Sequence, residues 1–400
     1  MSTLEIDHCG TNSSAGCASS DAPADTPLTV RSVELRSVSS SDLGRWCDLL
    51  ERASDPNPFL APCFVLPLIQ HLKASTPLSM LVVESAATGQ WMAAGVFETN
   101  TPVRWWSPAY ARSLSSPYSF LNGLLVDVQA GAAAIATMFE SQSHRRDWHG
   151  LHFGAVRGTS KLSRFLDTAA ARAGVRVFRC REWLRACYLN RGPQATDDIL
   201  ADCSKVRRKS LRRCRKRLEA LGDVHFQLVV PDNNSSPAVE TFLRLEQLGW
   251  KGEAGTAIAS HPDHEAFFRQ MIAGFAQDGS ILFGELLLNG VPIASTCNLR
   301  HGSLLCAFKI GWDPAYSEAG LGYWSEVELA SAISQQKPDI ARIDSSAKFG
   351  SYVESVWHER EPMMALTYTW SARGMAAEIA QKYLRLFKQS CQRQPVAAAS

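Results

Sequence analysis

Apolar residues recur along the first half of the chain with the periods expected of strands and helices. Strands are predicted at VRSVEL (30–35), MLVVES (80–85), MAAGVFET (92–99), LHFGAV (151–156) and VRVFRC (175–180). The second and third of these form a pair around the turn ATGQ. Helices are predicted over 131–143, over 160–173, and after Ser41 and Asp42, whose side chains can cap a helix carrying Trp46 and Leu49 on one face.

The second half has a more regular pattern. A leading helix (198–221) is followed by elements in the order β-α-α-β-β-β-loop-α-β-α-β. The strands are predicted at 224–230, 281–288, 293–299, 303–312, 341–344 and 364–370, and the helices at 237–249, 263–277, 321–335 and near 349–356. Asn289-Gly290 and His301-Gly302 predict tight turns between the three middle strands. This alternation predicts an α/β (α+β) fold.

A chain of 400 residues is too long for one ordinary domain and suits two. The segment RGPQATDD (191–198) is the natural boundary between them. We therefore predict a disordered tail at 1–27, domains at 28–192 and 193–391, and a second tail at 392–400.

Composition excludes several classes of protein. Hydrophobic residues make up 46% of the chain, charged residues 20%, and the net charge is +2, which is an ordinary globular balance that names no partner. The 11 cysteines are scattered without any CxxC, so the ligand spacing of a zinc ribbon or a thioredoxin site is missing. We see no signal peptide and no apolar run of membrane-spanning length, and we expect a cytoplasmic protein.

Other catalytic signatures are also missing from the sequence. It contains neither a GxSxG elbow nor a Walker A loop. His261 and His264 lie close together, but no third ligand is evident, so we expect no metal.

A glycine-containing loop is the first feature that points to chemistry. Ser317-Glu318-Ala319-Gly320-Leu321-Gly322 follows the three middle strands and runs directly into a helix. Glycines allow a ligand to approach the backbone closely. The N-terminus of the helix offers free N–H groups to an anion such as a pyrophosphate. Two glycines at this spacing are usually only a turn, and it is their position after the strands that favours a site.

These features resemble the GNAT acyltransferases, which place an acyl-CoA loop of the form (Gln/Arg)-x-x-Gly-x-(Gly/Ala) at this point. More narrowly, residues 240–357 resemble the CelD-like branch from cellulose biosynthesis, which is related to the Fem-type aminoacyltransferases. The residues that carry this resemblance are Leu245-Glu246 with Gly249-Trp250-Lys251-Gly252, then Lys309-Ile310-Gly311-Trp312-Asp313, and Asp344 followed by Tyr352. In the first half, Asn57-Pro58-Phe59 resembles an early motif of the branch.

The resemblance implies two GNAT-like domains, each a mixed, largely antiparallel sheet flanked by helices. It also implies acetyl-CoA or another acyl-CoA as co-substrate, with no metal. The acyl-CoA would be held by Ala319, Gly320, Leu321 and Gly322 together with the strand residues Phe308 and Ile310. The implied acceptor is a small molecule or saccharide from polysaccharide or cell-envelope biosynthesis.

Acyl transfer requires a base for the acceptor and an acid for the leaving thiolate. Tyr352 is the candidate acid, and its alternative is a packing role. Asp344 is a candidate base or the N-cap of the next helix, and Glu246 a candidate base or part of a solvated helix face.

Three further residues are candidates for binding the acceptor. Lys309 lies on an otherwise apolar strand, so it either pairs with Asp344 or contacts a ligand. Trp250 and Lys251 line an acceptor pocket or have ordinary core and surface roles.

A strongly basic helix is the second feature. Nine of the 13 residues from Lys205 to Arg217 are basic, and a narrow apolar stripe runs along them. Its arginines, among them Arg208 and Arg212, form a solvated face or bind an anionic partner, namely a phosphorylated substrate, RNA or a membrane surface.

Three functions are consistent with these patterns. The first is acyl-CoA-dependent transfer to an amine or hydroxyl. The second is Fem-like transfer from aminoacyl-tRNA, which two departures from the family pattern favour: Ser317 replaces Gln or Arg, and Glu318 adds a negative charge. A third departure, Val353 in place of the Lys that usually follows the tyrosine, is consistent with an altered substrate. The third is a non-enzymatic nucleic-acid or membrane-surface binder organised by the basic helix.

Overall fold

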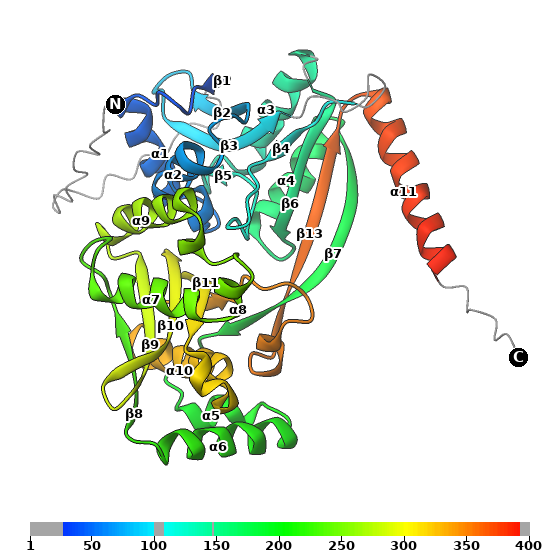
Figure 1. The fold of residues 1–400 in the computed structure, drawn as a ribbon. Coiled ribbons are helices and arrows are strands. Elements are labelled where there is room, and N and C mark those ends of the chain that lie inside the picture. Colours follow the sequence, from blue (N-terminus) through cyan, green and yellow to red (C-terminus); the bar gives the residue numbers. More distant parts are fainter. Residues whose placement is uncertain (1–26, 100–107, 146–147, 393–400) are drawn as a thin grey trace, which may run out of the picture.

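The computed structural model describes residues 27–99, 108–145 and 148–392 (Figure 1). The predicted tails 1–27 and 392–400 lie outside these residues except for residues 27 and 392. In the first half the elements are β1 (Leu28–Val33), α1 (Ser40–Arg52), α2 (Pro62–Leu72), β2 (Leu78–Ser85), β3 (Trp91–Thr99), β4 (Ala111–Ser113), β5 (Leu125–Val126), α3 (Gly131–Arg145), β6 (Gly150–Arg157), α4 (Lys161–Arg172) and β7 (Arg176–Leu189).

The second half contains α5 (Thr196–Ala201), α6 (Lys205–Glu219), β8 (Val224–Val229), α7 (Pro237–Leu248), α8 (Trp250–Glu253), α9 (Pro262–Ala276), β9 (Ile281–Leu288), β10 (Val291–His301), β11 (Leu304–Trp312), α10 (Leu321–Gln336), β12 (Arg342–Asp344), β13 (Glu359–Thr369) and α11 (Ala372–Gln392). Short 3-10 turns are η1 (Pro58–Leu60), η2 (Ile258–Ser260), η3 (Pro314–Ala319) and η4 (Tyr352–Ser355). The predicted order of the second half is confirmed.

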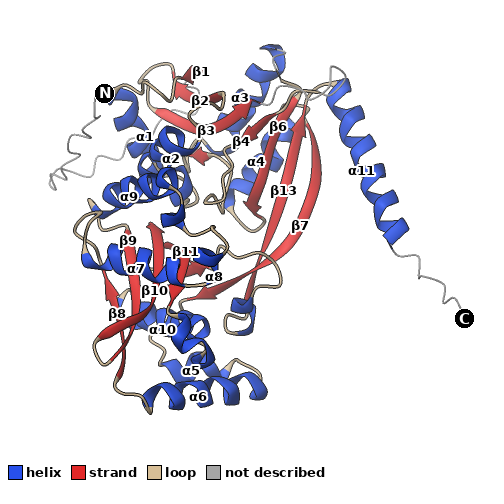
Figure 2. Cartoon of the chain, viewed as in Figure 1, coloured by secondary structure: helices blue, strands red, loops and turns tan. Residues whose placement is uncertain are grey.

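The strands form a single mixed sheet in which one arrangement occurs twice. Its order is β1-β2-β3-β4-β6-β13-β7-β12-β11-β10-β9-β8, with β5 paired to β3. Each half contributes antiparallel strands that end in one parallel pair, β4 with β6 in the first and β11 with β12 in the second. The expected fold class, with two domains of similar design flanked by helices, is confirmed (Figure 2).

The last strand of each half lies beside a strand of the other half. β13 pairs with β6 and β7, while β7 pairs with β13 and β12, and all of these pairs are antiparallel. The long ribbons of β13 and β7 run side by side through the middle of Figure 1. The division into domains at residues 192 and 193 stays a prediction, but each half completes its sheet with a strand of the other.

The helices pack the two halves together through an aromatic core. The rings of Phe64 on α2 and Phe267 on α9 meet edge to face at 5.6 Å. Near them, His71 and Gln270 are hydrogen bonded at 2.7 Å, and the Asn57 N–H donates to Nδ1 of His301 over 2.8 Å. The buried cluster that contains these phenylalanines draws on both halves, so the halves share a hydrophobic core as well as a sheet.

Several elements differ from the sequence prediction. The helix predicted over 198–221 is two helices, because Ser204 caps α6 by accepting from the Arg207 N–H over 3.2 Å. The strand predicted at 175–180 extends as β7 to Leu189, and the helical stretch near 349–356 is the 3-10 turn η4. Helices α2 and α11 and the short strands β4 and β5 were not predicted.

Among the described helices, none is both long enough and apolar enough to cross a membrane.

Candidate functional site

The loop before α10 has the conformation that its glycines permit. Gly320 ends η3 and precedes α10 with φ 64° and ψ 40°, in the left-handed region that favours glycine. Before it, Asp313 caps η3 by accepting from the Ala315 N–H over 2.9 Å. Ala319 and Leu321 are buried and anchor the loop, whereas Gly322 is only half-buried. The first turn of α10 therefore presents backbone N–H groups beside a glycine backbone, as an anion site requires.

Tyr352 lies directly over this first turn. A Cβ atom built on Gly322 would be 3.7 Å from the Tyr352 ring, and the rings of Tyr323 and Tyr352 meet edge to face at 5.2 Å. The ring of Tyr352 is 36% exposed, while its hydroxyl points inward to a buried partner. The structure thus brings together the predicted loop and the predicted acid, although they are distant in sequence.

That buried partner is Glu326 on α10, which the sequence analysis missed. The Tyr352 hydroxyl donates to Oε1 of Glu326 over 3.1 Å, while Oε2 is buried without a hydrogen-bond partner among the described residues. Burial raises the pKa of the Glu326 carboxyl to about 7, against a smaller lowering by the Tyr352 hydrogen bond. Burial, followed by the charge of Glu326, raises the pKa of Tyr352 well above its ordinary value.

One signal in the sequence could have identified Glu326. It follows Gly322 by four residues, so both lie on one face of the helix. A carboxylate on the buried face of a helix needs a partner or a function. The helix–loop pattern alone does not show that Tyr352 is brought to this face.

The basic helix α6 packs on the same loop. The Cys214 thiol lies 3.4 Å from the Glu318 carbonyl oxygen, and Arg217 is 3.6 Å from the Glu318 carboxylate. The Arg207 guanidinium stacks 4.5 Å from the ring centroid of Tyr323. The negative charge of Glu318 is therefore next to a cation of α6, and the loop lies in a positively charged neighbourhood.

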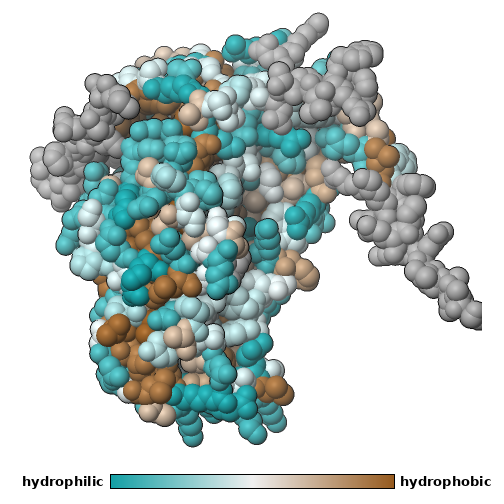
Figure 3. All heavy atoms as spheres, viewed as in Figure 1, coloured by the Kyte–Doolittle hydropathy of each residue, from teal (hydrophilic) through white to brown (hydrophobic). Residues whose placement is uncertain are grey.

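The two arginines singled out on α6 differ in exposure. Arg212 is exposed and bonded to Asp197 over 2.8 Å, whereas Arg208 is half-buried. The apolar stripe of the helix is turned into the protein, with Leu211 and Leu218 buried. The hydrophilic lower edge in Figure 3 is the region where α6 lies.

Strand β11 has an open edge beside this site. Its parallel pairing with β12 ends at Cys306, opposite Asp344, while β11 continues to Trp312. The register with β10 shifts by one residue at Phe308, which is a β-bulge. Phe308 itself is buried among Tyr118, Phe120 and Phe268, and Ile310 is half-buried. Phe308 therefore packs in the core shared by the halves, and Ile310 lies on the part of β11 beyond the pairing with β12.

Glu246 is buried rather than part of a solvated helix face. Its Oε1 is 3.3 Å from Nζ of Lys251, and its Oε2 accepts from the Ile258 N–H over 2.7 Å. Lys251 also donates to the Ile310 carbonyl oxygen over 2.9 Å. Trp250 begins α8, and its side chain lies outside the described part of the structure. Glu246 and Lys251 thus form a neutral pair that ties α7 and α8 to β11.

Asp344 and Lys309 do not pair with each other. Asp344 is buried, lies 3.4 Å from the Arg185 guanidinium of β7, and accepts from the Ser346 N–H over 2.7 Å. The Lys309 ammonium lies 4.9 Å from the ring centroid of Tyr118, a residue of the first half. Asp344 is also not the N-cap of η4, which is Ser351. The role of either residue in catalysis stays a prediction.

The two histidines make contacts with protein groups. His264 Nδ1 is 2.8 Å from the Tyr118 hydroxyl, and His261 Nε2 is 2.9 Å from the Gly255 carbonyl oxygen. Within the described residues, no three His, Cys, Asp or Glu side chains are grouped as metal ligands.

The turn before α3 in the first half is fixed by an aspartate. Helix α3 follows β4 and β5 as α10 follows β11, and Asp127 lies four residues before its start. The buried carboxylate of Asp127 accepts from the Gln129 N–H over 2.7 Å and pairs with Arg52. The entry to α3 is therefore held by a carboxylate, whereas the entry to α10 is a glycine.

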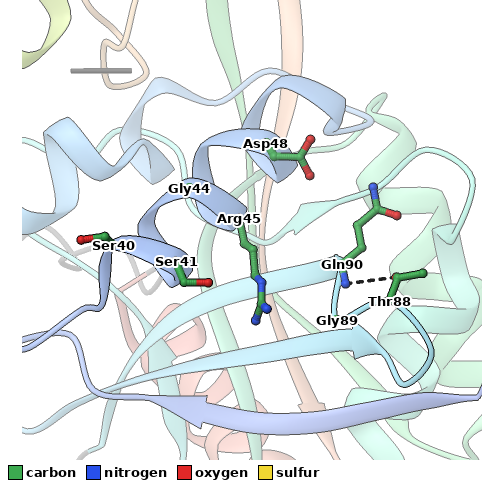
Figure 4. Close-up of a pocket in the computed structure, with 8 residues that line it drawn as sticks. All are labelled: Ser40, Ser41, Gly44, Arg45, Asp48, Thr88, Gly89 and Gln90. Carbon is green, nitrogen blue, oxygen red and sulfur yellow. Dashed lines mark hydrogen bonds between the residues drawn. The ribbon is translucent and has the colours of Figure 1, made fainter. Parts of the chain in front are cut away.

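A shallow depression elsewhere on the first half involves none of the candidate residues. It lies between the first turns of α1 and the turn that joins β2 and β3, with Arg45 and Gln90 at its sides (Figure 4).

The sequence profile of the acetyltransferase (GNAT) domain matches residues 205–347. This segment contains the loop, Glu326, Lys309 and Asp344. Within the second half of the chain, residues 205–347 are thus similar to GNAT domains. No curated protein matches the chain in sequence.

Solved structures with a similar fold match most of the chain. A conserved protein of unknown function from Bacteroides thetaiotaomicron is 11% identical with a TM-score of 0.50, over 86% of this chain and all of that one. FemX is 8% identical with a TM-score of 0.50, over 85% and 97%. A tandem GNAT protein from the clavulanic acid biosynthesis pathway is 14% identical with a TM-score of 0.43, over 86% and 98%. At these identities the likeness concerns the fold.

Proposed function

We propose that the protein is an acyl-CoA-dependent N- or O-acyltransferase that works by direct transfer. The observation that carries this proposal is the position of Tyr352 over the first turn of α10, where its hydroxyl is bonded to Glu326 further along the same helix. A candidate anion site for the donor and a candidate proton source are then neighbours. The GNAT domain supports transferase chemistry, and the open edge of β11 offers backbone N–H groups to the oxyanion.

The chemistry assigns a role to each group. The acceptor nitrogen or oxygen attacks the thioester carbonyl and releases its own proton to solvent, the carbon–sulfur bond breaks, and Tyr352 gives its proton to the leaving thiolate. In the structure the Tyr352 hydroxyl donates to Glu326, so it must turn its proton toward the thiolate; a protonated Glu326 then donates across the same 3.1 Å contact, replaces the proton that Tyr352 loses, and regains its own from solvent. The raised pKa of Glu326 keeps a substantial protonated fraction near neutral pH.

A second donor, aminoacyl-tRNA, is favoured by one observation. Helix α6 lies against the loop that precedes α10. The helix is 15 residues long and carries exposed cationic side chains. A donor with an RNA backbone would find phosphate contacts along that helix. Loss of activity after RNase treatment distinguishes this donor from a free acyl-CoA.

The binder hypothesis retains only the charged side of α6. Because Leu211 and Leu218 are buried against the second half, they are not available for insertion into a lipid surface.

Calorimetric titration with acetyl-CoA tests the first proposal. We expect micromolar binding to the wild type and loss of binding in Gly320→Glu, whose carboxylate would repel the pyrophosphate. Gly174→Glu is the matched control, because Gly174 has a similar φ of 66° and open space around it, but lies at the end of α4. Absence of binding to the wild type, or equal loss in both variants, would overturn the assignment of the loop.

A further inference from the structure

A half-buried cation lies at the seam between the two halves, on β11. Lys309 follows the bulge at Phe308, and its ammonium faces the ring of Tyr118 at 4.9 Å. Tyr118 is buried, and its hydroxyl is 2.8 Å from Nδ1 of His264 on α9. The two halves of the chain are both needed to form this cluster.

The nearest acid does not neutralise Lys309. Both oxygens of Glu246 are engaged, one by Lys251 and the other by the Ile258 N–H. Lys251 and Glu246 cancel in charge, which leaves the charge of Lys309 in excess. An ammonium has three donors, and among the described residues Lys309 has the face of Tyr118 but no hydrogen-bond acceptor.

The electrostatics agree with this arrangement. Burial, and then the positive charge of Lys251, lowers the pKa of the Lys309 ammonium, with Glu246 acting in the opposite direction. Burial also lowers the pKa of His264, and His261 and Lys309 add to that effect against Asp263. The cluster is therefore short of negative charge, and an anion bound there would stabilise it.

The position of Lys309 relative to the donor site indicates which substrate would carry the bound anion. Ala307 and Trp312 of β11 pack in the core around α10, on the side of the glycine loop. Phe308 packs in the core shared with the first half, and Tyr118, the neighbour of Lys309, belongs to the same core. Lys309 therefore contacts the core shared with the first half, whereas α10 packs in the other core, so a molecule held at Lys309 would approach β11 from the side away from α10.

We propose that Lys309, Tyr118 and His264 form an anion-binding subsite that recognises a carboxylate or phosphate group of the acceptor. The acceptor class is then an amine or hydroxyl compound carrying an acidic group, such as an amino acid or a sugar phosphate. The assignment of the bound anion to the acceptor rests on the proposed function. The existence of the anion-binding subsite does not, because it is argued from the contacts of Lys309, Tyr118 and His264 alone.

The first test needs no donor. Reductive methylation of lysines, quantified by peptide mass spectrometry, is run at constant ionic strength in chloride, in inorganic phosphate and in acetate. We expect phosphate or acetate to slow methylation of Lys309 but not of exposed Lys348, and the more effective of the two identifies the preferred anion. Equal rates at Lys309 in all three salts would overturn the subsite.

The second test compares matched acceptors with acetyl-CoA as donor: glycine against glycinamide, and glucosamine 6-phosphate against glucosamine. We expect the acidic member of at least one pair to have a higher kcat/KM by about tenfold or more, the size of one charged hydrogen bond. Lys309→Met should abolish this preference and Lys309→Arg should retain it.

The outcomes separate the two proposals. Protection of Lys309 without turnover of any acceptor supports the subsite and counts against acyl-CoA as donor. Turnover without acid preference or protection supports the transferase and overturns the subsite. Protection together with turnover that ignores the acidic group overturns the assignment to the acceptor.

Discussion

Glu326 lies in an environment that disfavours the charged form of its carboxyl group. Its carboxyl is buried on α10, with Tyr352 as the hydrogen-bond donor to one oxygen. Because the folded protein favours the protonated form, ionisation of Glu326 costs stability. At pH values below its ordinary pKa of 4.5, both folded and unfolded chains carry the proton and the cost vanishes.

Replacement Glu326→Gln removes that cost, because glutamine does not ionise. With the folded pKa raised from 4.5 to about 7, the penalty in the wild type grows through this window and is complete above it. The free energy of unfolding of the variant, relative to the wild type, should therefore rise by about 3 kcal/mol between pH 4.5 and pH 8. Urea unfolding at several pH values measures this difference, and a constant difference would contradict the raised pKa.

The role of a residue could be predicted only where the order of helices and strands along the chain determines which residues lie next to it. The pairing of Tyr352 with the glycine loop follows from the order of elements in the GNAT resemblance, and the structure places the two in contact. The surroundings of Glu246 and Asp344 depend on Ile258 and Arg185, which come from a distant turn and from the other half. No local pattern identifies such partners.

Helix α7 and strand β11 pack with their backbones close together. A Cβ atom at Gly311 would lie 2.7 Å from Cα of Glu246, so only glycine fits at this point of β11. This close approach also places the Glu246–Lys251 pair against the Ile310 carbonyl. The close packing of α7 on β11 thus explains why the Lys-Ile-Gly-Trp-Asp motif has glycine at its third position.

Gly311→Ala should push α7 away from β11 and lower the free energy of unfolding by about 1–3 kcal/mol, as overpacking does. The control is Gly44→Ala on α1, where nothing lies within 4 Å of the added atom. There the better helix former should raise stability by about 0.5–1 kcal/mol. Urea unfolding compares the two, and equal effects would show that the close approach is relieved at no cost.

Helices and strands with one clear hydrophobic period were predicted well. Those whose sequence also contains helix breakers or charged residues were not. The fully buried strand β9 and the amphipathic α4 agree with their predicted ranges. Helix α2 begins at Pro62 and contains Pro67, which reads as a breaker in sequence. The outer part of β7 carries Arg181, Glu182 and Arg185 and reads as a surface segment, although it lies in the middle of the sheet.

The whole molecule is held together at the centre of its sheet. Separating the chain at residue 192 would remove β13 from between β6 and β7, and β7 from beside β12. Each fragment would then expose strand edges that are paired in the intact protein. We expect fragments 28–192 and 193–400 to aggregate when expressed separately and to form a soluble one-to-one complex when expressed together.

Size-exclusion chromatography of the separate and combined fragments is the measurement. A soluble 28–192 fragment that unfolds cooperatively on its own would show that the first half does not need β13.

The exchanged strands also impose an order in time. Translation delivers β6 and β7 early, whereas β13, which fits between them, leaves the ribosome only after the whole GNAT domain has been made. The first half therefore waits on the ribosome with a gap in its sheet, and final closure is a post-translational step. A premature stop before β13 would therefore also disrupt the first half, because β6 and β7 would lose the strand between them.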